Sequence, residues 1–562
     1  MNVRKAPVSL RTVAAGVLAS MLLAGCWTGS RPGSPENSGS VSARSSASGP
    51  SAGSWSSADA TPASDPPVAS FDPAAHGVFS GDTSPDRQTS GSGTGAGVAG
   101  PAGVTSPPAG SGVDRYLNST VSWKPCGKYR CGSLAVPLDW NDPDGPAITL
   151  RMKKAPATGT RRGTLFINPG GPGSSGQDML NRFDVSAFPD HDVIAWDPRG
   201  SGESTPVRCG SGAQTDAYFN LDSSPDDQNE WNALTAGNKA FAQQCRAASG
   251  RLLDHISTID TARDLDLLRH LVGSPKLDYL GISYGTFIGA TYAEMYPTRV
   301  GRMVLDSAVN ITDDDSVTQV MGFDKAFRAF AQWCAEHNDQ CPLGDTADKV
   351  IDSTTRFLDR MDSRPLTVGT RKLTQSLAST GIAFYLYSGT ESYQYLGAAI
   401  TWAQRGEGRY LLAAADYLNG RDPDSGRWES SAYAFPAIAC RDEADRGLAG
   451  ARTQWTADVK KAPILGPTFG ASLSCVYWSA RPAEQMRITA SGAAPIVVLG
   501  VTGDPATPYE QARWMASQLS SGVLVTWRGA GHSAWSLGNS CVHSAVTGYI
   551  NSGQVPSDGL TC

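Results

Sequence analysis

The pentapeptide Gly281-Ile282-Ser283-Tyr284-Gly285 decides how the rest of the chain is interpreted. The apolar residues 277–280 before it predict a buried strand, and residues 286–295 after it predict a helix that Pro297 ends. A serine flanked by glycines between a strand and a helix is typical of a nucleophile elbow, a sharp turn that exposes the serine Oγ. We therefore expect Ser283 to be a nucleophile. Residues 49–53 match the same pattern, but no strand or helix surrounds them, so we attribute that match to chance.

The first 26 residues predict export. A charged start is followed by a short apolar run, residues 13–23, and then by small residues up to Cys26. This order is typical of a secretory signal, and the run is too short for a membrane span. The stretch Leu23-Ala24-Gly25-Cys26 resembles the lipobox of bacterial lipoproteins, which implies cleavage before Cys26 and lipidation of that residue. Several acyl chains on one residue would anchor the protein stably. The alternative is a secreted protein that is cut nearby and carries no lipid.

The cysteines agree with export. The chain has 11 cysteines, and setting Cys26 aside leaves an even number, as expected for disulfides in an exported protein. Chain order suggests pairs between neighbours, each of them a hypothesis: Cys126–Cys131, Cys209–Cys245, Cys334–Cys341, Cys440–Cys475 and Cys541–Cys562. The sequence contains no zinc-ligand spacing, no P-loop and no dinucleotide-binding glycine pattern, so we expect neither a metal nor a cofactor.

Composition divides the chain into segments. After a signal peptide at 1–25, residues 26–113 are rich in Ser, Gly, Pro, Ala and Thr, and we expect a lipid-anchored, disordered tether there. The rest is too long for one simple core. We expect a first core part at 114–310, a helical cap at 311–487 and a second core part at 488–562. The net charge of −6 is spread without long runs, so nothing indicates nucleic acid, and we expect a monomer that touches the membrane only through its anchor.

The folded part alternates strands and helices. Residues 164–168 and 192–196 are continuous apolar runs that end in glycine-rich turns, as buried parallel strands do. Residues 303–305, 495–499 and 522–527 continue the series, whereas residues between 310 and 487 show helical periodicity. The pattern predicts an α/β fold, with a mostly parallel central sheet, helices on both faces and a large helical cap insertion.

A serine nucleophile needs a base and an acid that orients the base. Among the seven histidines, only His532 follows a glycine turn directly after a predicted strand. Asp504 stands after the preceding strand in a proline-rich turn, and the order Ser283, Asp504, His532 is that of α/β-hydrolases. Asp306, at the end of an earlier strand, is the rival acid, for which a capping or pairing role is the other interpretation.

The oxyanion of an acyl-transfer reaction needs two preorganised donors. We expect one from the backbone N–H of Tyr284, directly after the nucleophile. The second is expected from Gly171, in the glycine-rich turn Asn168-Pro169-Gly170-Gly171-Pro172-Gly173. In the turn after the next strand, Asp197 and Arg199 are interpreted as members of structural ion pairs.

Together these motifs resemble one family. Residues 170–173, 197–202, 281–286 and 504–508 look like those of the prolyl iminopeptidase and tripeptidyl aminopeptidase family of α/β-hydrolases, and the segment from Cys541 to Cys562 is similar to the end of the tripeptidyl aminopeptidases. The resemblance implies the same triad, Ser283, Asp504 and His532. Pro169 stands where prolyl iminopeptidases have a histidine, which favours the tripeptidyl branch.

The resemblance implies an exported serine aminopeptidase that releases short, tripeptide-like N-terminal peptides through an acyl-enzyme on Ser283. Its substrates would be peptides with a free N-terminus, and Cys440-Arg441-Asp442-Glu443 is a candidate to bind the α-ammonium group, with a solvated acidic turn as the alternative. A carboxylesterase or lipase of the same fold remains an alternative function. A non-catalytic solute-binding lipoprotein is a more distant one.

Overall fold

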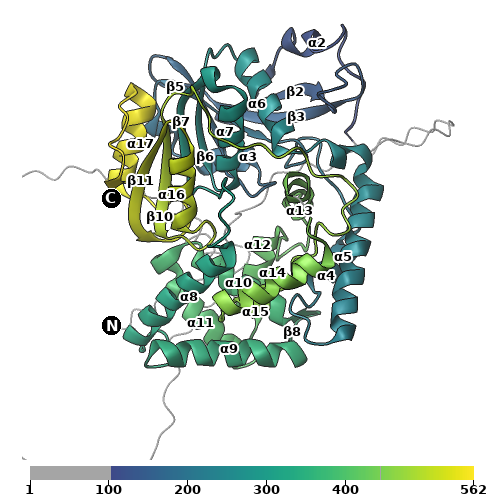
Figure 1. Cartoon of the computed structure of the whole chain (residues 1–562), viewed down its shortest axis with the longest axis vertical. Coiled ribbons are helices and arrows are strands. Elements are labelled where there is room, and N and C mark those ends of the chain that lie inside the picture. Colours follow the sequence, from purple (N-terminus) through teal and green to yellow (C-terminus); the bar gives the residue numbers. More distant parts are fainter. Residues whose placement is uncertain (1–102, 444) are drawn as a thin grey trace, which may run out of the picture.

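The computed structural model describes residues 103–443 and 445–562. Its main feature is a 10-stranded sheet with the order β1-β2-β3-β5-β4-β6-β7-β10-β11-β12 (Figure 1). The strands are β1 (Ser122–Cys126), β2 (Tyr129–Pro137), β3 (Ala147–Ala155), β4 (Gly163–Asn168), β5 (His191–Asp197), β6 (Leu277–Ile282), β7 (Val300–Asp306), β10 (Ile496–Gly503), β11 (Gly522–Ala530) and β12 (Leu560–Thr561).

The sheet is mostly parallel. All pairings from β5 through β4, β6, β7, β10 and β11 to β12 are parallel, whereas β1, β2 and β3 extend the sheet antiparallel beyond β5. The expected α/β-hydrolase architecture is therefore confirmed. The carboxyl ends of β6, β7, β10 and β11 lie at one edge, so the turns that follow these strands are neighbours.

Helices cover both faces because the central strands are apolar on both sides. Ile496 and Val498 of β10 belong to one buried cluster, and Val497 and Leu499 belong to the other. The first face is covered by α6 (Thr258–Leu271), α7 (Tyr284–Met295) and α16 (Tyr509–Gln518), and the second by α3 (Gly176–Arg182) and α17 (Ser540–Ser552). Alternation of side chains along a strand explains this division.

Residues 311–487, which we call the helical insert, leave the sheet after β7 and return before β10. The insert contains α8 (Gln319–Glu336), α9 (Ala347–Ser363), α10 (Gln375–Leu386), α11 (Tyr393–Gln404), α12 (Arg409–Asn419), α13 (Ser431–Asp442), α14 (Gly447–Lys461), α15 (Gly466–Phe469) and a hairpin of β8 (Leu366–Val368) and β9 (Arg371–Leu373). Its helices gather on one side of the sheet (Figure 1) and have a buried core of their own, built around Phe327, Phe330 and Phe357.

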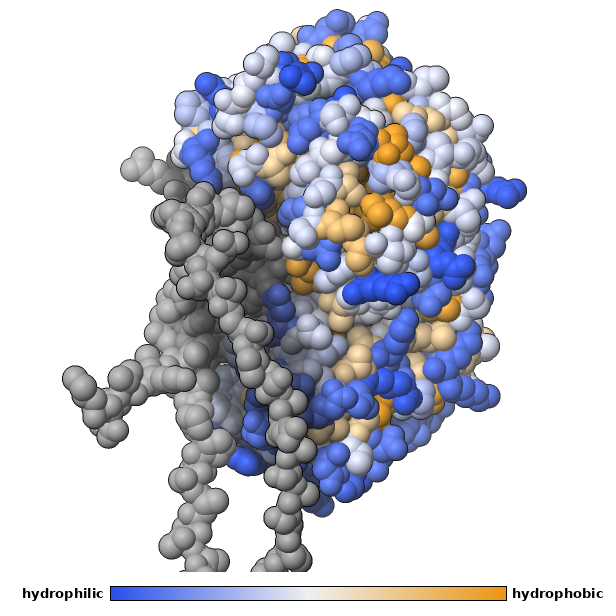
Figure 2. Space-filling view, turned by 90° about the vertical axis from the view of Figure 1, so that its left-hand side faces the viewer, coloured by the Kyte–Doolittle hydropathy of each residue, from blue (hydrophilic) through white to orange (hydrophobic). Residues whose placement is uncertain are grey.

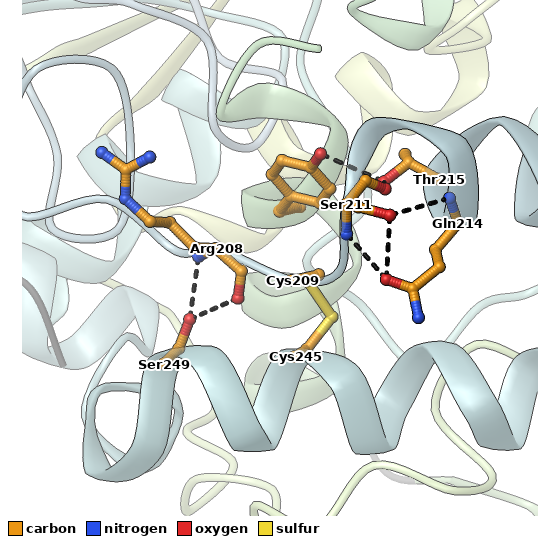
Figure 3. The surroundings of a disulfide bond; sticks show 8 residues. Arg208, Cys209, Ser211, Gln214, Thr215, Cys245 and Ser249 are labelled. Atoms are coloured by element: carbon orange, nitrogen blue, oxygen red, sulfur yellow. Dashed lines mark hydrogen bonds between the residues drawn. A yellow bond between two sulfur atoms is a disulfide. The ribbon is translucent and has the colours of Figure 1, made fainter.

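The structure contains the five disulfides that chain order suggested, so these pairings are confirmed. Cys209–Cys245 joins the loop after β5 to α5 (Gln228–Ser249), and a short helix, α4 (Gly212–Phe219), follows that loop (Figure 3). Beside this disulfide, Ser249 Oγ bonds both the N–H and the carbonyl of Arg208. Cys440–Cys475 joins the end of α13 to a loop of the insert. Such a disulfide set is typical of exported proteins.

The predicted signal peptide and Cys26 lie outside the described residues, as does the tether up to residue 102. Residues 103–113, assigned to the tether from composition, already contact the core, because Thr105 forms a backbone bridge with Ala147. The short helix α2 (Asp114–Leu117) follows. Within residues 103–443 and 445–562, no helix combines the length and apolar character that a membrane span requires. On the face shown in Figure 2, hydrophobic residues form small groups separated by hydrophilic ones.

Candidate active site

Ser283 lies in the turn between β6 and α7, as the elbow pattern predicts. Its backbone has φ 57° and ψ −127°, a strained conformation for a residue with a side chain. The flanking glycines are required by space: a Cβ on Gly281 would lie 2.4 Å from the carbonyl oxygen of Gly285, and one on Gly285 would lie 2.9 Å from that of Asn168. The N–H of Ser283 donates to the carbonyl of Asp306 at the end of β7 (2.9 Å). The neighbouring strand thereby fixes the elbow.

His532 and Asp504 form a hydrogen-bonded pair. His532 stands in the turn after β11, and its Nδ1 lies 2.9 and 3.0 Å from the two carboxylate oxygens of Asp504. Asp504 follows β10 and is buried, and it also accepts hydrogen bonds from the N–H groups of Ala506 and Thr507. The proline-rich turn thus holds the carboxylate against the imidazole, as expected. This contact fixes Nδ1 as the protonated nitrogen and leaves Nε2 free to accept a proton.

The environment of His532 favours its protonated form. Burial lowers the pKa of His532, but the carboxylate of Asp504 and, after it, that of Asp306 raise the pKa above its ordinary value. The imidazole is buried, with 7% of its residue surface exposed. An imidazolium that forms during proton transfer would therefore be stabilised by two neighbouring carboxyl groups.

Thr507 contacts both members of the Asp504–His532 pair, and sequence reasoning did not identify it as a site residue. Its Oγ1 donates to Asp504 Oδ2 (3.0 Å) and lies 3.4 Å from His532 Nδ1. The signal for such a contact was present in the motif, because a threonine three residues after an aspartate at a turn can bond that carboxylate. A hydroxyl beside both partners helps to hold the carboxylate against the imidazole.

The glycine-rich turn after β4 lies against the nucleophile elbow. A Cβ on Gly170 would lie 2.8 Å from Tyr284 N and 3.0 Å from Ser283 Cβ, so only glycine permits this approach. Gly171 is exposed, and the structure gives neither its N–H nor that of Tyr284 an acceptor within the described residues. An oxyanion site requires two N–H groups without other acceptors, and these two remain the predicted donors.

Comparisons with known proteins agree with this geometry. A family profile described as TAP-like protein matches residues 462–562. Serine protease Hip1 of Mycobacterium tuberculosis is 35% identical over 480 residues, covering 79% of this chain and 91% of the relative. The tripeptidyl aminopeptidase of Streptomyces lividans is 30% identical over 486 residues, covering 81% and 87%. Carboxylesterase B of Mycobacterium tuberculosis is 34% identical over 472 residues, covering 78% and 89%.

The chain belongs to the tripeptidyl aminopeptidase-like family of serine α/β-hydrolases. The family resemblance that the motifs indicated is thereby confirmed, and the chain is a serine hydrolase.

In this member of the tripeptidyl aminopeptidase-like family, the helical insert contacts the candidate site at two places. Next to α10, the carbonyl of Tyr387 accepts the N–H of His532 (2.7 Å), and the Tyr387 ring meets the imidazole edge-on, with 5.3 Å between ring centroids. On the other side, α13 lies against the glycine-rich turn, since a Cβ on Gly173 would lie 2.7 Å from Ala434 Cβ. Phe435, the next residue of α13, is 51% exposed.

The acidic segment at the end of α13 divides into two roles. Asp442 accepts the N–H and the hydroxyl of Thr258, at the start of α6, and the hydroxyl of Tyr284, directly after Ser283. Burial raises the pKa of Asp442 to about 7. This residue therefore ties the insert to the core, and the alternative of a solvated acidic turn is wrong for it. The side chain of Glu443 is accessible to solvent, but the protein packed around its carboxyl group partly desolvates it and so raises the pKa of Glu443 as well.

Asp197 and Arg199 hold the scaffold around the site. Arg199 is buried and bonds both carboxylate oxygens of Asp264 on α6, so the predicted ion pair is confirmed for it. Asp197 instead accepts hydrogen bonds from neutral donors, Ser175 and Gln177, at the start of α3. It is a helix-capping carboxylate and not half of an ion pair. It fixes the helix that follows the glycine-rich turn.

A hollow of about 610 Å³ lies away from these residues. It is lined by residues of the loop before α5, of α9, and of α14 with its following loop, among them Pro225, Asp359 and Trp455. None of its lining residues belongs to the candidate active site. Its volume alone assigns it no role.

Proposed function

We propose that the chain is an exported serine aminopeptidase that releases short, tripeptide-like fragments from the free N-terminus of peptides. The observation that carries the proposal is the hydrogen-bonded pair of Asp504 and His532, which stands at the same sheet edge as the strained serine turn. Family membership supports the serine chemistry, and the peptidase names of two relatives support the peptide substrate.

In this mechanism Ser283 is the nucleophile, His532 the general base and Asp504 the group that orients it. Ser283 Oγ attacks the scissile carbonyl carbon while its proton passes to His532 Nε2. The carbonyl oxygen becomes an oxyanion that accepts hydrogen bonds from the N–H groups of Tyr284 and Gly171. Collapse of this intermediate breaks the C–N bond, and His532 gives its proton to the leaving amine. A water molecule then hydrolyses the acyl-enzyme by the same sequence of proton transfers.

The helical insert supports exopeptidase action. We assign the insert, residues 311–487, the role of a cap over the active site. Residues 114–310 and 488–562 then form the two parts of the core. The insert contacts both the turn after β11 that carries His532, which we call the histidine turn, and the glycine-rich turn after β4. It therefore borders the reacting centre from two directions. Glu443 is the exposed carboxylate on this border, because its neighbour Asp442 reaches the hydroxyl of Tyr284. We assign Glu443 to the substrate α-ammonium group, and the apolar ring of Phe435 to a substrate side chain.

Lipid attachment at Cys26, with 1–25 as signal peptide and the residues from 26 to about 102 as tether, is the anchoring part of the proposal, since residues 103–113 contact the core. The lipobox-like sequence supports it, and the disulfides support passage out of the cytosol. The mass of the mature N-terminal peptide tests it, because an unmodified Cys26 or a cut elsewhere would contradict it.

A matched substrate series tests the aminopeptidase assignment. Three substrates are compared: a tripeptide amide with a free amine, its acetylated form, and a short acyl ester. We expect acetylation to lower kcat/KM about 30-fold or more, because a carboxylate that pairs with the ammonium group is left unpaired. In Glu443→Gln, the free peptide should lose most of this advantage while the acetylated peptide is cleaved as before. Equal rates on both peptides, with faster ester hydrolysis, would favour the esterase function that the likeness to carboxylesterase B supports.

A further inference from the structure

Asp306 is a second buried carboxyl group beside His532, and the mechanism above does not use it. It ends β7 and has 0% of its surface exposed. Within the described residues, three hydrogen bonds reach its side chain, and all come from the turn directly after His532: from Ser533 Oγ (2.6 Å), from Ala534 N (3.0 Å) and from Trp535 N (3.0 Å). The carboxyl group thus binds the backbone on which the imidazole stands, whereas Asp504 binds the imidazole itself.

The main chain of the same residue holds the nucleophile. The carbonyl of Asp306 accepts the N–H of Ser283 (2.9 Å), so one residue bonds the serine turn with its backbone and the histidine turn with its side chain. Ser307 reinforces the second contact, because its Oγ accepts the N–H of Ser533 (2.8 Å). Ser283, Ser307 and Ser533 all have positive φ, 57°, 52° and 78°. Three strained residues thus adjoin Asp306: Ser283 through its backbone carbonyl, Ser533 through its carboxyl group and Ser307 as the next residue in the chain. Strained backbone persists only where its surroundings hold it.

We propose that Asp306 is a positioning residue that sets the distance between Ser283 and His532 and places a second negative charge behind the imidazole. The inference rests on the proposed roles of Ser283 and His532. Burial raises the pKa of Asp306 above its ordinary value, and the three donors and the nearby His532 oppose this rise because they favour the ionised form of the carboxyl group.

Few other titratable groups surround the imidazole, so the effect of each on the pKa of His532 can be distinguished. Asp504 faces it from the turn after β10, and Tyr387 faces it from the insert. His543, on α17, stacks on Trp535 and bonds the carbonyl of that residue, so it lies behind the turn. Of these groups, only Asp504 and Asp306 raise the pKa of His532 against the effect of burial. Neutralising Asp306 therefore has a predicted direction: the pKa of His532 falls.

Asp306→Asn tests the proposal because asparagine keeps the shape and removes the charge. With a free tripeptide amide as substrate, we expect kcat to fall about tenfold to a hundredfold with little change in KM, since misplacement of the base affects the chemical step. The acidic limb of kcat/KM should move to lower pH, because that limb reports the pKa of the base in the free enzyme. A merely structural carboxyl group would lower thermal stability and leave the limb in place.

Asp324→Asn is the matched control. Asp324 is also buried and accepts two backbone N–H groups, those of Ile464 and Leu465, but it lies in the insert on α8. We expect this variant to lose stability while its acidic limb stays at the wild-type pH. An Asp306→Asn protein whose kcat and acidic limb both match those of the wild type would overturn the proposal. So would a lower kcat with an unmoved limb.

Ser533→Ala keeps the test decisive if Asp306→Asn does not fold. It removes one of the three hydrogen bonds to the carboxyl group and leaves the charge. We expect kcat to fall about threefold to tenfold with the acidic limb unchanged, and a wild-type kcat would overturn the positioning role. Ser283→Ala separates this inference from the proposed function: if that variant remains active, the proposed function fails. If it is inactive while Asp306→Asn behaves as wild type, only the positioning role fails.

Discussion

Individual residues join the helical insert to the core through buried polar contacts. Asp442 shows this most clearly, because its carboxyl group reaches both the start of α6 and the side chain that follows the nucleophile. From the sequence, Asp442 and Glu443 could not be told apart, since both stand in one acidic segment beside a cysteine. Burial separates them, and burial depends on residues that are distant in the sequence.

The stability contribution of Asp442 should depend on pH. Its pKa is about 7 in the folded protein and near 4 in an unfolded chain, so folding favours the protonated form. Stability is therefore lost as the pH rises from about 4 to about 7, and the full loss persists above that. In Asp442→Asn this loss is absent. The free energy of unfolding, variant minus wild type, should increase by about 1 to 3 kcal/mol between pH 4 and pH 8.

Urea unfolding at the two pH values measures this change. Asp339→Asn serves as the control, because Asp339 is exposed on the insert and its substitution should give the same difference at both pH values. A difference for Asp442→Asn that stays constant or shrinks as the pH rises would contradict the assignment.

At the scale of elements, the insert and the histidine turn meet through backbone. The helical turn Gly389–Ser392 follows α10, and a Cβ on Gly389 would lie 2.3 Å from the carbonyl oxygen of Ala530. A Cβ on Gly531 would in turn lie 3.1 Å from Gly389 N. The insert is therefore part of the support of His532.

Gly389→Ala should disturb this contact. We expect a loss of stability of about 2 to 4 kcal/mol and a fall in kcat of at least tenfold, because the Ala530 backbone must move and His532 follows two residues later. Gly369→Ala is a close control, since Gly369 has φ 60° against 57° for Gly389 and no atom lies within 4 Å of its added Cβ. Thermal unfolding and steady-state kinetics are measured on both variants. Because alanine at either position has the same cost of a positive φ, the difference between the variants reports the clash with the Ala530 backbone. Equal effects in the two variants would contradict a supporting role for the insert.

The sequence predicted those elements whose patterns are local. Buried parallel strands such as β4 and β5 are continuous apolar runs, the serine turn carries its own glycines, and disulfide partners were neighbours in the chain. It did not predict the contacts of Tyr387 and Gly389 with the histidine turn, because they join residues more than 140 positions apart and depend on how distant segments pack. For the same reason Asp306 was treated as a rival acid: its place at a strand end was visible, but its three donors were not.

At the scale of the whole molecule, the proposed reacting groups of this hydrolase come from several segments of the chain. Ser283 follows β6, Asp504 follows β10 and His532 follows β11, and the family relatives match across about four-fifths of the chain. Parallel strands bring these turns to one edge, and the insert borders them. In the proposed mechanism the substrate would reach Ser283 between the sheet edge and the insert, which suits the end of a peptide better than the middle of a folded protein.

The central claim is that Ser283 forms an acyl-enzyme with the N-terminal part of a peptide. Intact-mass measurement after rapid acid quenching tests it most directly, with a free tripeptide ester as substrate so that acylation outpaces hydrolysis. The account predicts an adduct of the mass of the tripeptide acyl group, located on the peptide that contains Ser283. The adduct should be absent in Ser283→Ala, whose kcat should be lower by about a thousandfold or more. An adduct on another residue, or undiminished turnover by Ser283→Ala, would contradict the account.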